Sequence, residues 1–175
     1  MPDNTAIIAE IADRQAITDL LLAYCGACDR CDERALNACF HPESTHDHGG
    51  YCGPSREWVA PALTWLQGRT GITHMIATPR IVVLGDNAVS DCHFVAYNRL
   101  AKDADLTEEV LVKGRYVDRL VRTAGGWKII HRIGIHDLEL VRDIPTSERP
   151  DALGPKSGTG AHDPFTKELA ALLAS

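Results

Sequence analysis

The first part of the chain carries apolar residues at the three- and four-residue spacing of an amphipathic helix. This spacing runs from residue 5 to residue 30 and predicts one long helix. Leu22 and Cys25 widen the apolar face, so we expect the second half of this helix to be buried nearly all round. The positions that carry the spacing are Ile8, Ile11, Ile17, Leu20, Leu21, Tyr24 and Cys28.

Two shorter helices are predicted after it. The first covers residues 32 to 40, with Asp32 as its N-cap, and ends at His41-Pro42. The segment STHDHGGYCGP then reads as a short strand and a Gly-rich turn. The second helix covers residues 55 to 67, where Pro61 is expected to kink or split it.

After Gly71 the pattern changes to β-structure. Four long segments rich in β-branched and aromatic residues are separated by turn signals at GDN, KDAD and TAGG. Helices followed by an antiparallel meander predict an α+β fold, and a strongly curved sheet around the helices would enclose one pocket. We expect residues 1–145 to form this domain. Residues 146–175 read as a polar tail with a short helix at PFTKELAALLA.

Composition narrows the class of protein. The 175 residues suit one domain, and 45% hydrophobic with 24% charged residues is ordinary for a soluble protein. A net charge of -6 and the lack of a Lys/Arg run argue against a nucleic-acid partner. No apolar run reaches the ~20 residues of a membrane span, and MPDNTAIIAEIADRQ lacks the layout of a signal peptide. We therefore expect a cytoplasmic protein with free thiols.

The stretch YCGACDRCDER places Cys25, Cys28 and Cys31 at every third residue, which resembles part of an iron–sulfur loop. Such a loop needs irregular backbone, whereas these cysteines continue the helical apolar pattern. On a helix Cys25 and Cys31 point about 120° apart and cannot converge on one metal. Buried core thiols are the favoured interpretation, with metal binding as the alternative.

The end of the long helix holds the first candidate for chemistry. Asp29 follows an apolar run, and a buried carboxylate is costly unless it is paired. His74 in ITHMIATPRI and Arg132 in WKIIHRIGIHD are candidate partners. By the two-residue period of a strand, Arg132 and His136 share one face and His131 points the other way.

The same period puts His46 and His48 on one face and turns Asp47 away from them. This arrangement disfavours a metal site at HPESTHDH, and none is predicted. Phe94 and Ala96 are expected to face the pocket, with His93 on the opposite side of the strand.

Four stretches together resemble the SnoaL-like branch of the nuclear transport factor 2-like superfamily, over roughly residues 8 to 143. The resemblance implies a cone-shaped α+β barrel, in which three helices close a curved, mostly antiparallel sheet over a deep apolar pocket. It also implies a homo-oligomer, a dimer or a trimer. The stretches are RQAITDLLLAYCGACDRCDERAL, HPESTHDHGGYCGP, GITHMIATPRIVV and GRYVDRLVRTAGGWKIIHRIGIHDLELVR.

Members of this superfamily include hexachlorocyclohexane dehydrochlorinase, bile-acid 7α-dehydratase and scytalone dehydratase, which are lyases without a cofactor. Likeness to the dehydrochlorinase implies a catalytic pair at Asp29 and His74 and a pocket arginine at Arg132. Likeness to the bile-acid enzyme implies a functional Tyr24. That enzyme's last-strand arginine falls at His136 and its further aspartate near Ala96, so this chain copies neither enzyme.

These residues predict an acid–base elimination of water, halide or a similar group from a small apolar, ring-bearing substrate. His74 would be the base, and Asp29 would hold its tautomer. Arg132 would stabilise developing negative charge, and Tyr24 would bind a substrate oxygen. His48 or His136 would act as the acid, while His46, His136, Phe94 and Ala96 would line the pocket.

Several alternatives stay open. Asp29 could cap a helix, Arg132 could only pair with Asp29 or a surface carboxylate, and Tyr24 could be a core residue. An isomerase or an aldol-type cyclase would use similar chemistry, and a non-catalytic binding module would share the fold. The chain contains no GxGxxG, GxxxxGK[ST] or GxSxG motif, so no cofactor is expected.

Overall fold

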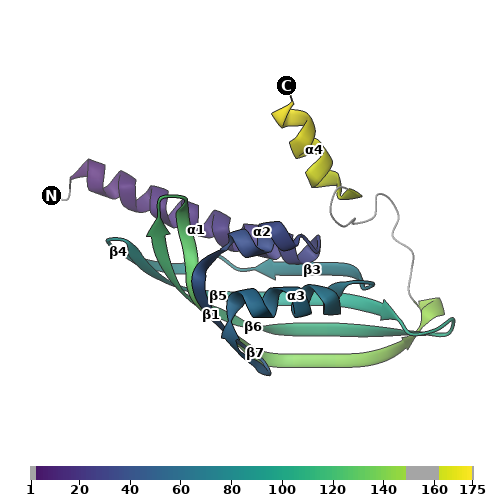
Figure 1. The fold of residues 1–175 in the computed structure, drawn as a ribbon. Helices are drawn as coiled ribbons and strands as arrows, with labels where there is room; N and C mark the ends of the chain where they lie inside the picture. Colours follow the sequence, from purple (N-terminus) through teal and green to yellow (C-terminus); the bar gives the residue numbers. More distant parts are fainter. Residues whose placement is uncertain (1–2, 149–161, 175) are drawn as a thin grey trace.

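The computed structural model describes residues 3–148 and 162–174. Three helices precede most of the sheet, and a fourth lies near the C-terminus (Figure 1). The elements in chain order are α1 (Asn4–Asp29), α2 (Glu33–Ala38), β1 (Phe40–His48), β2 (Tyr51–Pro54), α3 (Ser55–Leu66), β3 (Thr70–Ile76), β4 (Arg80–Leu84), β5 (Asn87–Ala101), β6 (Leu106–Thr123), β7 (Gly126–Pro145), the 3-10 turn Thr146–Glu148 and α4 (Pro164–Leu173).

The strands form one curved sheet in the order β2-β1-β7-β6-β5-β3, with β4 beside β5. All neighbours are antiparallel except β1 and β7, which run parallel. The predicted α+β class and mostly antiparallel sheet are confirmed. α1, α2 and α3 lie against one face of this sheet (Figure 1).

Local sequence explains where the helices begin. Asp3 and Asp32 are the N-caps of α1 and α2, and their carboxylates accept hydrogen bonds from the backbone N–H groups of Thr5 and Ala35. The predicted N-cap at Asp32 is confirmed. α3 continues through Pro61 without a break.

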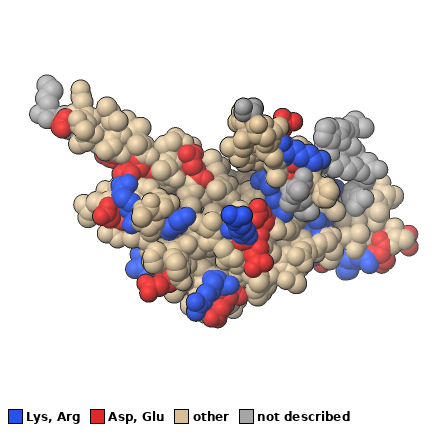
Figure 2. All heavy atoms as spheres, turned by 45° about the horizontal axis from the view of Figure 1, so that its top comes forward, with Lys and Arg blue, Asp and Glu red and all other residues tan. Residues whose placement is uncertain are grey.

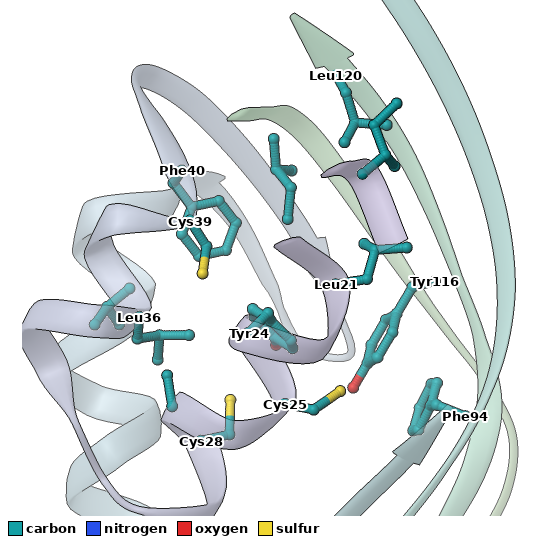
Figure 3. Close-up of a cluster of buried hydrophobic side chains, with 14 of the residues drawn as sticks. Leu21, Tyr24, Cys25, Cys28, Leu36, Cys39, Phe40, Phe94, Tyr116 and Leu120 are labelled. Atoms are coloured by element: carbon teal, nitrogen blue, oxygen red, sulfur yellow. The ribbon is translucent and has the colours of Figure 1, made fainter. Parts of the chain in front are cut away.

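The core lies between the inner face of α1 and the concave face of the sheet. Figure 3 shows Tyr24 on α1 facing Tyr116 on β6, with Phe94 from β5 beside Tyr116. The Tyr24 and Tyr116 rings meet edge to face at 5.7 Å, and the Phe94 and Tyr116 rings stack at 4.1 Å. Such aromatic contacts add to the free energy gained by burying the ring area.

Some element predictions were wrong in detail. The second half of α1 is not buried all round, because Leu22 is 52% exposed. The helix predicted for residues 32–40 ends at Ala38, and His41-Pro42 already belongs to β1. The first β-rich segment forms two strands, β3 and β4, because Pro79 interrupts the run between them.

The C-terminal helix lies beside the end of α1. Asp163 caps α4 and accepts a hydrogen bond from Arg30 Nε at 2.7 Å, and the Arg30 guanidinium lies over the Phe165 ring. The predicted helix in the tail is thereby confirmed. In the described ranges, no helix combines the length and the apolar character that crossing a membrane requires.

Candidate active site

A cavity of about 270 Å³ opens between α1, α3 and the concave face of the sheet. Its walls are mainly apolar and aromatic, with a few convergent polar groups, as in many small-molecule sites. The lining residues that matter most below are Tyr24, His48, Trp58, His74, Asn98 and His136.

Asp29 and His74 form the pair that the resemblance implied. The His74 backbone N–H and ring Nδ1 both bond to Asp29 Oδ1, at 2.9 Å and 2.7 Å. A carboxylate only accepts hydrogen bonds, so Nδ1 carries a proton, and in the neutral ring Nε2 has a free lone pair. The last residue of α1 thus fixes the tautomer of a histidine that lines the cavity.

A second group of histidines reaches the cavity from β1 and β7. His46 Nε2 lies 3.2 Å from His48 Nδ1, and His48 Nε2 lies 3.0 Å from His136 Nε2. The predicted common face of His46 and His48 is confirmed, and Asp47 is exposed on the other side. His48 and His136 line the cavity, but His46 lies behind His48 with no exposed surface. The expectation that His46 lines the pocket was therefore wrong.

The surroundings of His46 and His48 keep these two rings neutral. Burial, helped by the charge of Arg132, lowers the pKa of His46 to about 2. Burial, with the charges of His136 and Arg132, lowers the pKa of His48 to about 3. A neutral imidazole holds a single N–H proton, and both ring nitrogens of His48 are already bonded to other histidines, so His48 is not suited to act as the predicted acid.

Close fit holds His48 in place. Gly134 faces His48 across the parallel β1–β7 pair, and a Cβ on Gly134 would meet His48 Nδ1 at 2.5 Å. From α3, the Trp58 ring stacks on His46 at 4.1 Å and lies 5.4 Å from the His48 ring. Gly134 on β7 and Trp58 on α3 thus leave a closely fitting space for the His48 ring.

Arg132 does not occupy the position that the resemblance implied. Its side chain is fully buried, and Nε and Nη2 each donate to a different oxygen of Asp118 at 2.7 Å. The guanidinium lies 3.9 Å from the Tyr24 ring centroid and 4.2 Å from that of Tyr116. Arg132 is absent from the cavity lining. The physical reason is Asp118, which faces Arg132 directly in the β6–β7 register.

The other predicted pocket residues, Tyr24, Phe94 and Ala96, all line the cavity. Burial raises the pKa of Tyr24 well above its ordinary value, so the phenol keeps its proton. His93 is exposed on the outer side of β5, as expected.

Sequence reasoning missed Trp58, Asn98 and Glu139 in the lining and Asp118 behind it. A signal existed for two of them. Asn98 continues the inward-facing series of β5, and Asp118 continues that of β6, at positions where apolar residues are the rule.

Most of the cysteines belong to the core, but Cys52 is exposed. Cys25, Cys28 and Cys39 are buried free thiols, and burial raises the pKa of Cys25 to about 12 and that of Cys39 to about 11. The predicted buried thiols are confirmed for Cys25 and Cys28, whereas Cys31 is only partly buried and lies just past the end of α1. Within residues 3–148 and 162–174, no three His, Cys, Asp or Glu side chains are grouped as a metal site.

A comparison with known protein families shows which family the chain belongs to. The model of the SnoaL-like domain matches residues 9–133. The chain belongs to the SnoaL-like domain family. An uncharacterized protein of Mycobacterium tuberculosis is 30% identical to this SnoaL-like chain over 133 residues, which cover 72% of the chain and 86% of the relative.

Solved structures place the SnoaL-like chain in the nuclear transport factor 2-like fold. A hexachlorocyclohexane dehydrochlorinase from Novosphingobium barchaimii is similar with a TM-score of 0.65 and 16% identity, covering 84% of this chain and 99% of that one. A candidate scytalone dehydratase from Novosphingobium aromaticivorans gives 0.62 and 19%, covering 83% and 94%. At these identities the likeness shows the fold, and the neighbours sharing it include lyases.

Proposed function

We propose that this SnoaL-like protein is a lyase that eliminates a small group, such as water or halide, from an apolar ring-bearing molecule by acid–base chemistry. The observation that carries the proposal is the double hydrogen bond from His74 to Asp29 beside the cavity. A neutral, oriented imidazole is suited to remove a proton from carbon near neutral pH.

His74 Nε2 would take the proton, and Asp29 would stabilise the imidazolium that forms. The C–H electron pair would form the double bond as the bond to the leaving group breaks. For a departing hydroxyl, the His74 imidazolium can return its proton to oxygen, so water leaves and His74 is neutral again. Tyr24 would donate a hydrogen bond to the group that gains negative charge.

The shape of the cavity supports an apolar, ring-bearing substrate. Trp58, Trp65, Phe94 and Tyr116 all contribute aromatic surface to its lining. Flat rings stack well on such walls. The same proton abstraction without a leaving group would give an isomerase, which Tyr24 would assist by donating to an enolate oxygen.

The test is turnover of a panel of hydroxylated and halogenated ring compounds by wild type, Asp29→Asn and His74→Ala. We expect kcat for elimination to fall by about 10²–10⁴ in each variant. Ligand binding should persist in both variants. His93→Ala is the matched control, because His93 is exposed on the outer side of β5. Full turnover by His74→Ala would contradict the proposal.

A further inference from the structure

The cavity contains a polar side chain that the proposed chemistry does not use. Asn98 on β5 lines the cavity and is only 4% exposed. It lies on the inner face with Phe94 and Ala96, among otherwise apolar neighbours such as Val110 and Val112. A buried amide in such a wall is costly unless its polar atoms are bonded.

One end of this amide is fixed by Arg69. Arg69 Nη1 donates to Asn98 Oδ1 at 2.9 Å and to Glu108 Oε1 at 3.1 Å. The guanidinium lies 3.8 Å from the centroid of the Trp65 ring, and its side chain is 7% exposed. Arg69 is thus held by α3 and β6 and holds the amide on β5.

The contact determines which way the amide points. A guanidinium only donates hydrogen bonds, so the Asn98 atom facing Arg69 must be the oxygen. The NH₂ group is therefore the free end. Among the described residues, no acceptor is bonded to Asn98 Nδ2. This nitrogen keeps some exposed surface, because it is not among the fully buried atoms that lack a partner.

The position of Asn98 relative to the catalytic pair is set by strand register. His74 faces Ala96 across the β3–β5 pair, and Asn98 lies two residues farther along the same face. At ~3.4 Å per residue this is about 7 Å along the strand. A ligand atom bonded to Asn98 would lie about one ring from the carbon presented to His74.

Charge selects the kind of ligand atom. The described lining contains no Lys or Arg, and Glu139 contributes a carboxylate. The charge of Arg69 is already balanced by Glu108. An anionic group would find no cation here, whereas a neutral carbonyl oxygen would match a neutral N–H donor.

We propose that Asn98 is a specificity residue, which donates a hydrogen bond to a neutral carbonyl-type oxygen about one ring away from the site of proton removal. Calling the ligand a substrate rests on the proposed function, but the hydrogen bond itself does not. The ligand class is therefore a neutral cyclic ketone or a similar ring with one acceptor oxygen.

The test is equilibrium binding of a matched pair, 1-tetralone and tetralin, followed by the quenching of tryptophan fluorescence. We expect wild type to bind the ketone about tenfold more tightly, since one buried hydrogen bond separates the two. Asn98→Leu should lose this preference by weakening ketone binding alone. Asn98→Asp keeps an acceptor for Arg69 but removes the N–H donor, and should lose the preference as well.

Asn87→Leu is the control, because Asn87 lies on the same strand but at its exposed end. Thermal unfolding checks that each variant is folded, and Asn98→Asp carries the test if Asn98→Leu does not fold. Equal affinity of wild type for the two ligands, or an unchanged ratio in a folded Asn98 variant, would overturn the inference. Because binding is measured without turnover, a failed lyase assay leaves this result standing.

Discussion

His46 is a buried imidazole and His48 a partly buried one, and their hydrogen bonds and stacking suit the neutral form. His46 is fully buried behind His48, and its Nδ1 has no bonding partner among the described residues. Its pKa is lowered to about 2, mainly by burial, and that of His48 to about 3. These two residues should therefore make the free energy of unfolding depend on pH.

The sign follows from where the protons bind. Below the ordinary histidine pKa of about 6.5 the unfolded chain takes up protons at both positions. In the folded chain the His48 ring takes up a proton only near pH 3, and the His46 ring only near pH 2. Their contribution to stability is thus complete above about pH 6.5 and is lost as pH falls below it.

We predict that His46→Phe weakens this acid sensitivity. A phenyl ring can keep the stacking on Trp58 but takes up no proton. Between about pH 6 and pH 4 the free energy of unfolding should fall less steeply in His46→Phe than in wild type. The two slopes should differ by about 1.4 kcal/mol per pH unit. Denaturant titrations across this range measure the slope. His93→Phe, at an exposed position, should follow wild type; parallel curves for all three proteins would refute the prediction.

At the residue scale, sequence reasoning worked where one strand's alternation decides the outcome. The common face of His46 and His48 and the outward direction of His93 follow from a period of two. The contact of Asp29 with His74 joins residues 45 positions apart; the pattern offered His74 and Arg132 as partners, and the resemblance singled out His74. Arg132 was misplaced because its partner, Asp118, depends on the register between two strands.

At the scale of elements, β6 and β7 are joined by a charge pair inside the molecule. Arg132 and Asp118 have no exposed side-chain surface and form two hydrogen bonds. Removing one partner of a buried pair leaves the other charge without compensation, which costs about 3–5 kcal/mol. Replacing both by apolar residues of similar volume is often neutral.

We therefore predict that Arg132→Met lowers the free energy of unfolding by about 3–5 kcal/mol, and that adding Asp118→Leu restores most of it. Urea unfolding of the three proteins measures this cycle. Arg142→Met is the matched control, since Arg142 pairs with Glu109 across the same two strands but is 61% exposed. The control should cost under about 1 kcal/mol. If Arg132→Met cost no more than the control, the pair would not be structural.

The long strands were the easiest elements to predict, because turn signals separate β5, β6 and β7 clearly. The parallel pairing of β1 with β7 could not be predicted from local pattern. It joins residues about 85 apart, as in Thr45 and His131, whose side chains bond at 2.6 Å. That pairing brings His48 beside His136 and so completes this wall of the site.

At the scale of the whole molecule, helices on one face and curvature of the sheet create the cavity. The order of elements and the resemblance were sufficient to predict this architecture. The details of the lining depend on which side chains meet, so Asn98 and Trp58 appeared only with the structure. Figure 2 shows acidic and basic side chains intermixed on one face of the molecule.

The helix α4 lies largely outside this architecture. No residue of α4 itself is buried, and no α4 residue belongs to the described cavity lining. Asp163, just before α4, is the anchor: its carboxylate bonds to Arg30 Nε at 2.7 Å, and Arg30 also lies over Phe165. A partly exposed ion pair of this kind contributes at most about 1 kcal/mol.

We predict that a chain ending at Glu148 keeps its fold and its site. The midpoint of thermal unfolding should stay within a few degrees of wild type, because losses near 1 kcal/mol shift a domain of this size by about 2–4 °C. Affinity for 1-tetralone should change by less than about threefold, since α4 contributes nothing to the described lining.

Arg30→Gln in the full chain is the matched control, as it releases the anchor while retaining α4. A large fall in affinity on truncation but not in Arg30→Gln would show instead that the tail closes the cavity. A change in light-scattering mass on truncation would assign it to subunit contacts.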